Sequence, residues 1–190
     1  MSPLADSTLA ALLADVAAAT PAPGGGSTAA VACALAAALV EMSAGAPHER
    51  AAALRARAVE LADADLDSYA PVLAAQRLPA DDPARPERLR GALSEASQVP
   101  LAIAEVGCEV AELAAELARG GRRSLEGDAT AGALLAEAAT RAAVRLVELN
   151  LAGQPGDARL GAAREHAARA WAAREAAVTT AASDSPPGRS

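Results

Sequence analysis

Residues 20–27 read Thr20-Pro21-Ala22-Pro23-Gly24-Gly25-Gly26-Ser27, and they lead directly into the almost wholly apolar segment 28–42. The two prolines fix φ and disfavour a helix, while three consecutive glycines open backbone conformations that other residues avoid. Ser27 and Thr28 can then cap a helix. The stretch predicts a glycine loop at a helix N-terminus, where N–H groups and the helix dipole suit an anionic or carbonyl-bearing ligand. A tight turn between two close-packed helices explains the same residues equally well.

The segment from Ser27 to about Ala44 is apolar on all faces, as in a central helix that is buried on every side. Apolar periodicity and glycine or proline breaks predict five further helices, at about 7–19, 48–77, 89–117, 128–151 and 157–180. Within the two longest of these helices, Pro71 is expected to cause a kink or a local irregularity and Pro100 a kink. No strand pattern appears, so the sequence predicts an all-α bundle of about six helices, two of them long.

The composition agrees with one helical domain. Hydrophobic residues make up 52% of the 190 residues, yet aromatic residues make up only 1% and there is no Phe. The core must therefore be built from Ala, Leu and Val, with Leu134 and Leu135 among the candidates, and this favours close-packed helices over a β-sandwich. We expect a single domain at 1–182 and a disordered tail at 183–190, which has two prolines and no apolar residue.

The charged residues exclude several classes of function. The net charge is −7 with a pI of about 4.9, which disfavours nucleic acid and anionic membrane surfaces as partners. All 17 basic residues are Arg, so there is no lysine for a Schiff base or a P-loop. The N-terminus lacks the basic region of a signal peptide, and the apolar stretch Thr28–Val40 is shorter than a membrane span. These features predict a cytoplasmic protein.

Cysteine and histidine give no catalytic or metal-binding pattern. Cys33 and Cys108 lie in predicted helices without CxxC spacing, and we expect both to be buried free thiols rather than metal ligands. His48 and His166 lie in polar helical surroundings with no nucleophile at a recognisable spacing. No metal site is predicted.

Several carboxylates are candidates for proton transfer. Asp63, Asp65 and Asp67 fall within one predicted helix, and Asp63 and Asp67 are i, i+4 neighbours, so one pKa is raised if the pair is partly buried. A solvated acidic helix face is the alternative explanation. Asp128 stands at a glycine-flanked helix start, where N-capping is the ordinary role of an aspartate.

Taken together, these segments resemble the cyclodeaminase/cyclohydrolase family. That family includes the C-terminal cyclodeaminase domain of formiminotransferase-cyclodeaminase and stand-alone bacterial methenyltetrahydrofolate cyclohydrolases. The resemblance extends over residues 4–180. The segments that carry it, in order, are the glycine stretch at 20–27, Asp67-Ser68-Tyr69, Arg77-Leu78-Pro79, the segment 95–101, and Asp128 with 134–138.

The resemblance implies an all-helical homodimer with a folate site near the glycine loop. The implied reaction is closure of 5-formiminotetrahydrofolate to 5,10-methenyltetrahydrofolate with loss of ammonia, or hydrolysis of the methenyl compound. Both reactions pass through a tetrahedral carbon between N5 and N10 and need orientation and proton transfer. Carboxylates and backbone donors are expected to supply both without a metal or another cofactor.

The resemblance also implies roles for particular residues. Asp128 is expected to contact the pterin or transfer a proton, with Asp67 as its partner. The folate-binding loop would consist of Pro23, Gly24, Gly25, Gly26 and Ser27. The glutamate tail of folate would meet the basic residues Arg77, Arg122 and Arg123.

The chain departs from the family pattern at three places. Gly45-Ala46-Pro47 replaces a polar loop after the core helix, and Leu146-Val147-Glu148 stands where relatives often have Asn-x-Arg. Ser124 and Gly127 replace an Asn and a Ser at the second junction. These changes remove polar contacts, reverse one charge and favour an alternative: a catalytically degenerate helical dimer that binds a ligand or partner without turnover. A purely structural bundle without a pocket is a third possibility, but it leaves the glycine stretch without a role.

Overall fold

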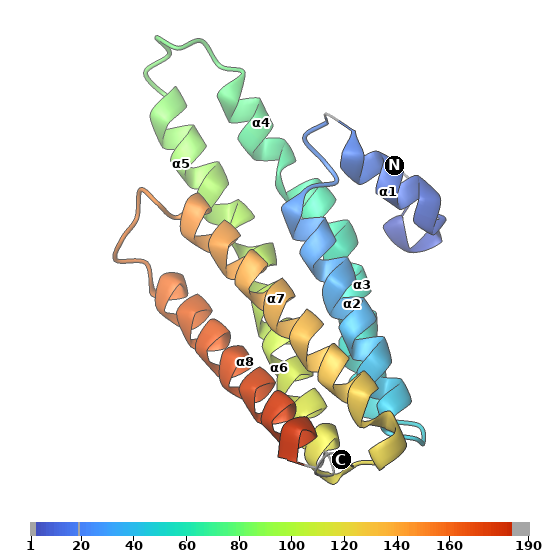
Figure 1. The fold of residues 1–190 in the computed structure, drawn as a ribbon. Helices are drawn as coiled ribbons and strands as arrows, with labels where there is room; N and C mark the ends of the chain where they lie inside the picture. Colours follow the sequence, from blue (N-terminus) through green and yellow to red (C-terminus); the bar gives the residue numbers. More distant parts are fainter. Residues whose placement is uncertain (1–2, 19, 184–190) are drawn as a thin grey trace, which may run out of the picture.

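A computed structural model describes residues 3–18 and 20–183 of the chain. Within these ranges it contains eight α-helices, two short 3-10 helices and no β-strand (Figure 1). Of the predicted tail 183–190, Ser183 is the last residue of α8, and the remainder lies outside the described residues. The elements are η1 (Leu4–Asp6), α1 (Leu9–Ala17), α2 (Gly25–Ser43), α3 (Glu49–Ser68), α4 (Ala70–Gln76), α5 (Arg85–Ala96), α6 (Gln98–Gly120), η2 (Arg123–Leu125), α7 (Glu126–Asn150) and α8 (Ala158–Ser183).

The all-α bundle is confirmed, and each of the two long predicted helices is divided in two. The predicted helix 48–77 breaks at Tyr69 into α3 and α4, and Pro71 lies in the first turn of α4. The predicted helix 89–117 breaks at Ser97, so that Pro100 falls in the first turn of α6. Proline lacks an N–H and is tolerated in a first helical turn, where that N–H has no partner. Both prolines therefore stand at helix starts rather than at kinks within continuous helices.

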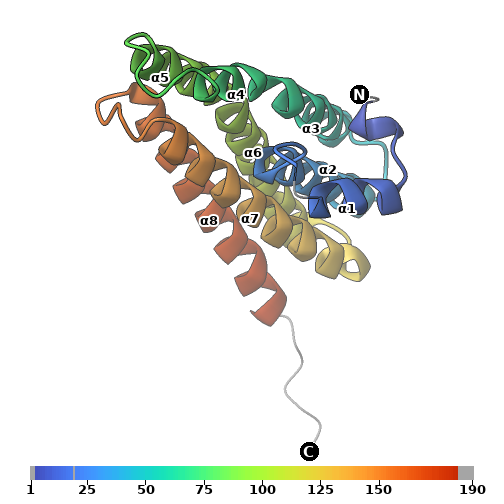
Figure 2. The ribbon, with the colours of Figure 1, turned by 90° about the horizontal axis from the view of Figure 1, so that it is seen from above.

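The long helices form an antiparallel bundle in which α6 contacts α2, α3, α7 and α8 (Figure 2). The pairing of α2 with α7 fixes the direction of both helices. Gly25 at the start of α2 lies next to Leu146 near the end of α7, whereas Val40 near the end of α2 lies next to Gly132. At one end of the bundle α4 and α5 pack on each other and extend beyond the other helices (Figure 1).

Small side chains let α2, α6 and α7 approach closely. A Cβ atom on Gly107 of α6 would overlap the Thr140 hydroxyl of α7 and would lie 3.0 Å from the Cys33 sulfur of α2. Thr140 is fully buried and donates its hydroxyl hydrogen to the carbonyl oxygen of Ala136, 2.8 Å away. The core at this crossing thus depends on a position without a side chain.

Cys33 and Cys108 are both buried free thiols, as predicted. Burial raises the pKa of the Cys33 thiol to about 12, because the thiolate would lose its hydration. Burial, together with the nearby carboxylate of Glu112, raises the pKa of Cys108 to about 11. Both side chains serve as small apolar groups in the packing.

The central helix α2 is covered on three sides rather than on every side. It packs on α3, α6 and α7, but Leu35 on its remaining face is 58% exposed. At 19 residues α2 is also longer than the apolar stretch Thr28–Val40, and by length and composition it could cross a membrane. The expectation that this segment is too short for a span is therefore wrong, although the core helix of a water-soluble bundle passes the same test.

Several apolar side chains on α1 and α7 are exposed in the single chain. Leu9 and Leu13 of α1 are 70% and 60% exposed, and only Leu12 of that helix packs against the core. Leu134 and Leu135 of α7, expected in the core, are also exposed. Their neighbours Ala133 and Ala136 face the interior, because α7 turns its alanine-rich side toward α2 and α6.

Candidate functional site

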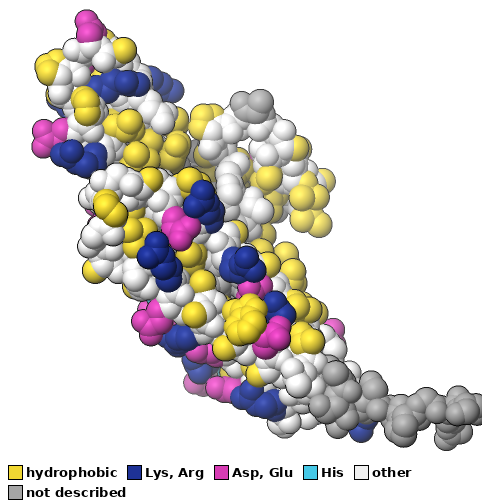
Figure 3. Space-filling model, turned by 60° about the vertical axis from the view of Figure 1, so that its left-hand side comes forward, with side chains coloured by type: hydrophobic (Ala, Val, Ile, Leu, Met, Phe, Trp, Pro, Cys, Tyr) yellow, Lys and Arg dark blue, Asp and Glu magenta, His cyan; other side chains and the backbone are white. Residues whose placement is uncertain are grey.

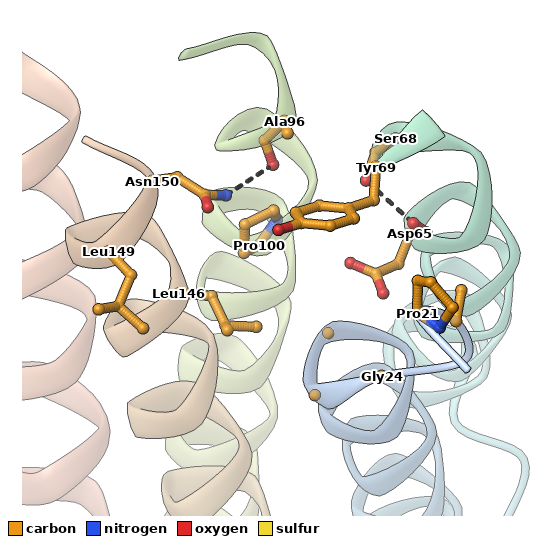
Figure 4. Close-up of a pocket in the computed structure, with 13 residues that line it drawn as sticks. Pro21, Gly24, Asp65, Ser68, Tyr69, Ala96, Pro100, Leu146, Leu149 and Asn150 are labelled. Atoms are coloured by element: carbon orange, nitrogen blue, oxygen red, sulfur yellow. Dashed lines mark hydrogen bonds between the residues drawn. The ribbon is translucent and has the colours of Figure 1, made fainter. Parts of the chain in front are cut away.

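A pocket of about 450 Å³ lies between the start of α2, the end of α3, the start of α6 and the end of α7 (Figure 4). Its volume falls within the range of small-molecule sites. Gly24, Gly25 and Gly26 form one side, and Asp65 of α3 and Tyr69, the C-cap of that helix, reach in from another. Leu146, Leu149 and Asn150 of α7 close the side opposite α3. The bundle thereby brings four segments that are far apart in sequence to one cavity.

The carboxylate of Asp65 occupies the N-terminus of α2. Its Oδ2 atom accepts hydrogen bonds from the Ser27 backbone N–H, 2.7 Å away, and from the Ser27 hydroxyl, 2.8 Å away. A carboxylate is stabilised at this position by charge-assisted bonds and by the helix dipole. Ser27 is itself buried, so it holds Asp65 from a fixed position. Among the described residues no donor is bonded to the other oxygen, Oδ1.

Gly26 is required for space. A Cβ atom at this position would overlap the Asp65 carboxylate and would lie 2.5 Å from its Cγ. Gly25 and Gly26 already belong to the first turn of α2, Gly24 is the N-cap, and Gly45 is the only described glycine with a positive φ. The expectation that the triplet provides unusual loop conformations is therefore wrong. The loop ends at Gly24, and the lack of a side chain at Gly26 lets α3 approach α2.

The predicted anion site at the start of α2 is already filled by the chain itself. Ser27 gives its N–H to Asp65, and the first intrahelical bond runs from the Thr28 N–H to the Gly24 carbonyl. Gly25 and Gly26, whose N–H groups precede that bond and have no partner within the helix, both line the pocket. A second anion here would lie beside the carboxylate of Asp65, so the pocket favours ligands that bring hydrogen-bond donors or positive charge.

The opposite wall is fixed by Arg159, the second residue of α8. Its guanidinium donates to the Ser94 carbonyl at 2.6 Å, to the Ser94 hydroxyl at 2.7 Å and to the Ser97 hydroxyl at 2.8 Å. Two further bonds, of 2.9 and 2.7 Å, join it to the carboxylate of Asp157. Hydrogen bonding from Arg159 lowers the pKa of Asp157 to about 2.

The bonds from Arg159 to Ser94 and Ser97 hold the turn between α5 and α6 in place. At this turn the Ala96 carbonyl accepts a hydrogen bond from the Asn150 side-chain N–H at 3.3 Å.

Asp65 is the only charged residue among those that line the pocket, and no arginine lines it. Several basic side chains form ion pairs elsewhere, as in Arg169 with Glu112 and Arg145 with Glu148. The surface seen in Figure 3 accordingly mixes acidic and basic side chains with small apolar patches. The pocket is therefore negatively charged in its own right.

A family model described as formiminotransferase-cyclodeaminase matches residues 8–48 and 46–170. The chain belongs to this family. The fold also matches the crystal structure of formiminotetrahydrofolate cyclodeaminase from Thermotoga maritima, with a TM-score of 0.82 and 23% sequence identity. That match covers 93% of this chain and 96% of the Thermotoga chain. No curated protein matches the sequence.

In this member of the formiminotransferase-cyclodeaminase family, the predicted loop residues lie at or beside the pocket. Gly24, Gly25 and Gly26 line it, and the Ser27 hydroxyl donates a hydrogen bond to the Asp65 carboxylate. Pro23 lines the neighbouring apolar groove between α1 and α7 instead. The folate-binding role of these residues remains a prediction.

The two predicted acids do not meet at this pocket. Asp67 is exposed on the side of α3 that faces away from α2, and Asp63 accepts a 2.6 Å bond from the Leu4 N–H. Asp128 lies in the first turn of α7, eighteen residues before Leu146, which is about 27 Å along the helix. Within one chain Asp67 and Asp128 therefore cannot share a ligand, and only a second copy could bring Asp128 to the glycine segment.

The predicted basic residues are also remote from the pocket within one chain. Arg122 lies against Gly45 at the far end of α2, and Arg123 begins η2 nearby. Arg77 is exposed at the end of α4 and does not line the cavity. Their predicted contact with a glutamate tail stays a prediction.

Asp65, Tyr69 and Asn150 line the pocket but were not predicted as site residues. Asp65 and Tyr69 are i, i+4 neighbours and share a helix face, whereas Asp67 lies about 200° around the helix from Asp65. The aromatic residue at 69, the only Tyr in the chain, was a usable signal. It marks Asp65, rather than Asp67, as the acid on its own face of α3.

Proposed function

We propose that this chain converts 5-formiminotetrahydrofolate to 5,10-methenyltetrahydrofolate and ammonia in the pocket between α2, α3, α6 and α7. The observation that supports this proposal most directly is the Asp65 carboxylate, held by Ser27 at the edge of a cavity large enough for a pterin. Membership of the formiminotransferase-cyclodeaminase family supports the substrate class. The ring of Tyr69 lies across the cavity and offers a flat apolar surface for a pterin (Figure 4).

The reaction requires one proton to move between two nitrogens. N10 attacks the carbon of the formimino group, which is protonated on its terminal nitrogen, so that the N10–C bond forms, the C=N π bond opens and a tetrahedral centre results. A carboxylate accepts the proton from N10 and delivers it to the former imino nitrogen. The C–N bond then breaks, ammonia leaves, and the positive charge remains on the methenyl product. Asp65 supplies such a carboxylate, and because it accepts one proton and releases one, it ends the reaction in the protonation state in which it began.

A homodimer is proposed as the assembly. A groove of about 520 Å³ between α1 and α7 is lined almost entirely by apolar residues, including Val16, Ala32 and Leu135. The exposed Leu9 and Leu13 lie on the same α1 helix. Apolar surface of this kind is stabilised when a second subunit removes it from water.

Two assays separate the candidate reactions. Absorbance of methenyltetrahydrofolate is expected to rise when the enzyme receives the formimino substrate, with equimolar release of ammonia. Loss of that absorbance on addition of methenyltetrahydrofolate, with no reaction of the formimino compound, would identify a cyclohydrolase instead. Folate binding by calorimetry without turnover in either assay would support the catalytically degenerate dimer. The structural argument for that alternative is that two apolar side chains of α7, Leu146 and Leu149, line the pocket.

A further inference from the structure

The pocket has a distinctive charge balance. Asp65 contributes a negative charge, and within one chain no arginine among the lining residues offsets it. The N-terminus of α2 provides a partial positive charge of about +0.5, less than the full charge of the carboxylate. The local balance therefore favours a cationic group on the ligand and disfavours an anionic one.

The two oxygens of Asp65 have different surroundings. Oδ2 accepts both bonds from Ser27. Oδ1 lies above the Cα of Gly26, where only a missing side chain leaves room for it. Asp65 itself lines the pocket, and among the described residues no donor is bonded to Oδ1, so this oxygen can accept a bond from a ligand. A charge-assisted bond to this atom would not disturb the bonds that hold the residue.

The formimino group on N5 of the substrate is an amidine. Amidines are stronger bases than simple amines, because protonation spreads the charge over two nitrogens, so this group is a cation at neutral pH. Its terminal nitrogen carries N–H bonds that a carboxylate can accept. The glutamate end of the substrate is anionic and finds no basic side chain in the pocket.

We infer that Asp65 selects the substrate by the charge of the formimino group, with Oδ1 binding its =NH₂⁺ end while Oδ2 remains on Ser27. This inference rests on the proposed function for the identity of the ligand. It places the reacting end of the folate beside α2 and the glutamate tail outside the cavity. It also predicts discrimination against 5-formyltetrahydrofolate, which has the same skeleton but a neutral carbonyl oxygen in place of the charged nitrogen.

The test compares these two compounds on the full-length protein and on Asp65→Asn. The amide of Asn has nearly the shape of the carboxylate, and its oxygen can still accept the bonds from Ser27. The KM for 5-formiminotetrahydrofolate, or the Kd from calorimetry where turnover is lost, is expected to rise about 10- to 100-fold. The Ki of 5-formyltetrahydrofolate should be essentially unchanged. Glu60→Gln on the exposed side of α3, where Glu60 pairs only with Arg57, is the matched control and should leave both constants unchanged.

The outcomes separate this inference from the proposed function. Equal weakening of both compounds in Asp65→Asn would show a structural role for the carboxylate and would overturn the inference. A fall in kcat with unchanged binding of the formimino compound would also overturn it, since Asp65 would then move protons without selecting charge, yet the proposed reaction would stand. If the unaltered protein neither binds nor converts the formimino compound, the proposed function itself fails.

Discussion

The Cα of Gly26 lies so close to the Asp65 carboxylate that a methyl group there would displace one of the two residues. Gly25, its neighbour in the same helical turn, would meet only Leu146 at an ordinary 3.8 Å. The position of Gly25 therefore has room for a Cβ atom, whereas the position of Gly26 does not. This difference allows the contact between α2 and α3 to be tested with one methyl group.

Gly26→Ala is expected to lower the free energy of unfolding by about 1–3 kcal/mol, because the added Cβ overpacks the contact with Asp65. Gly25→Ala should change it by less than about 1 kcal/mol, since alanine also has the higher helix propensity. Urea denaturation of both variants measures the difference. Equal stability of the two would show that the carboxylate can move away from α2 without cost.

A second residue-scale contact lies in the core. Gly107→Ala should destabilise the protein by about 1–3 kcal/mol, because its Cβ would overlap the Thr140 hydroxyl. Gly91→Ala in α5 is the control, since a Cβ there meets no heavy atom within 4 Å and should stabilise by about 0.5–1 kcal/mol. Thermal or urea unfolding of both variants measures whether the free energy of unfolding falls in the first and rises in the second. A Gly107→Ala protein as stable as the original would contradict the close crossing of α6 and α7.

At the scale of helices, Arg159 joins the start of α8 to the α5–α6 turn, and Asp157 holds its guanidinium in place. The pKa of Asp157 is lowered from 3.8 to about 2 by that partner. A carboxyl group whose pKa is lower in the folded state than in the unfolded state stabilises the folded protein. This contribution is fully present above the unfolded-state pKa and is lost as the pH falls through the folded-state pKa. The stabilising contribution of Asp157 should therefore be full above about pH 4 and absent below about pH 2.

The corresponding experiment is urea denaturation of the original protein and of Asp157→Asn between pH 2 and pH 7. We expect the original protein to be more stable by a constant amount above about pH 4, with the difference closing toward pH 2. Asp81→Asn, at an exposed position in the α4–α5 loop, is a control for a general charge effect. A difference between the original and Asp157→Asn that does not vary with pH would contradict the role of the ion pair.

The helices could be predicted from sequence because apolar periodicity and proline or glycine breaks are local signals. The site could be predicted only in part. The glycine segment was identified, but choosing Asp65 over Asp67 required knowing which face of α3 turns toward α2. The remote position of Asp128 follows from the antiparallel pairing of α2 with α7, which no local pattern encodes. Leu134 and Leu135 look like core residues in sequence, yet the alanines beside them fill that role.

At the scale of the whole molecule, the exposed apolar residues of α1 and α7 lead to a prediction about assembly. Leu13→Glu combined with Leu135→Glu should convert a dimer to a monomer, because two charges would have to be buried in an apolar interface. Light scattering after size-exclusion chromatography measures the mass. Val178→Glu on α8 is the control and should remain dimeric. A monomeric unaltered protein would contradict the proposed assembly, and with it any sharing of Asp128 between subunits.

The burial of both native thiols has a practical consequence for measuring ligand binding in solution. With pKa values of about 12 and 11, Cys33 and Cys108 hold their protons and should react slowly with maleimides while the chain is folded. A single new cysteine at an exposed position such as Leu149, on the rim of the pocket, would then be the preferred point of attachment for a fluorescent dye. Ligand entry could be read from that dye without first removing the natural sulfhydryls, and replacement of Cys33 would disturb the crowded contact among α2, α6 and α7.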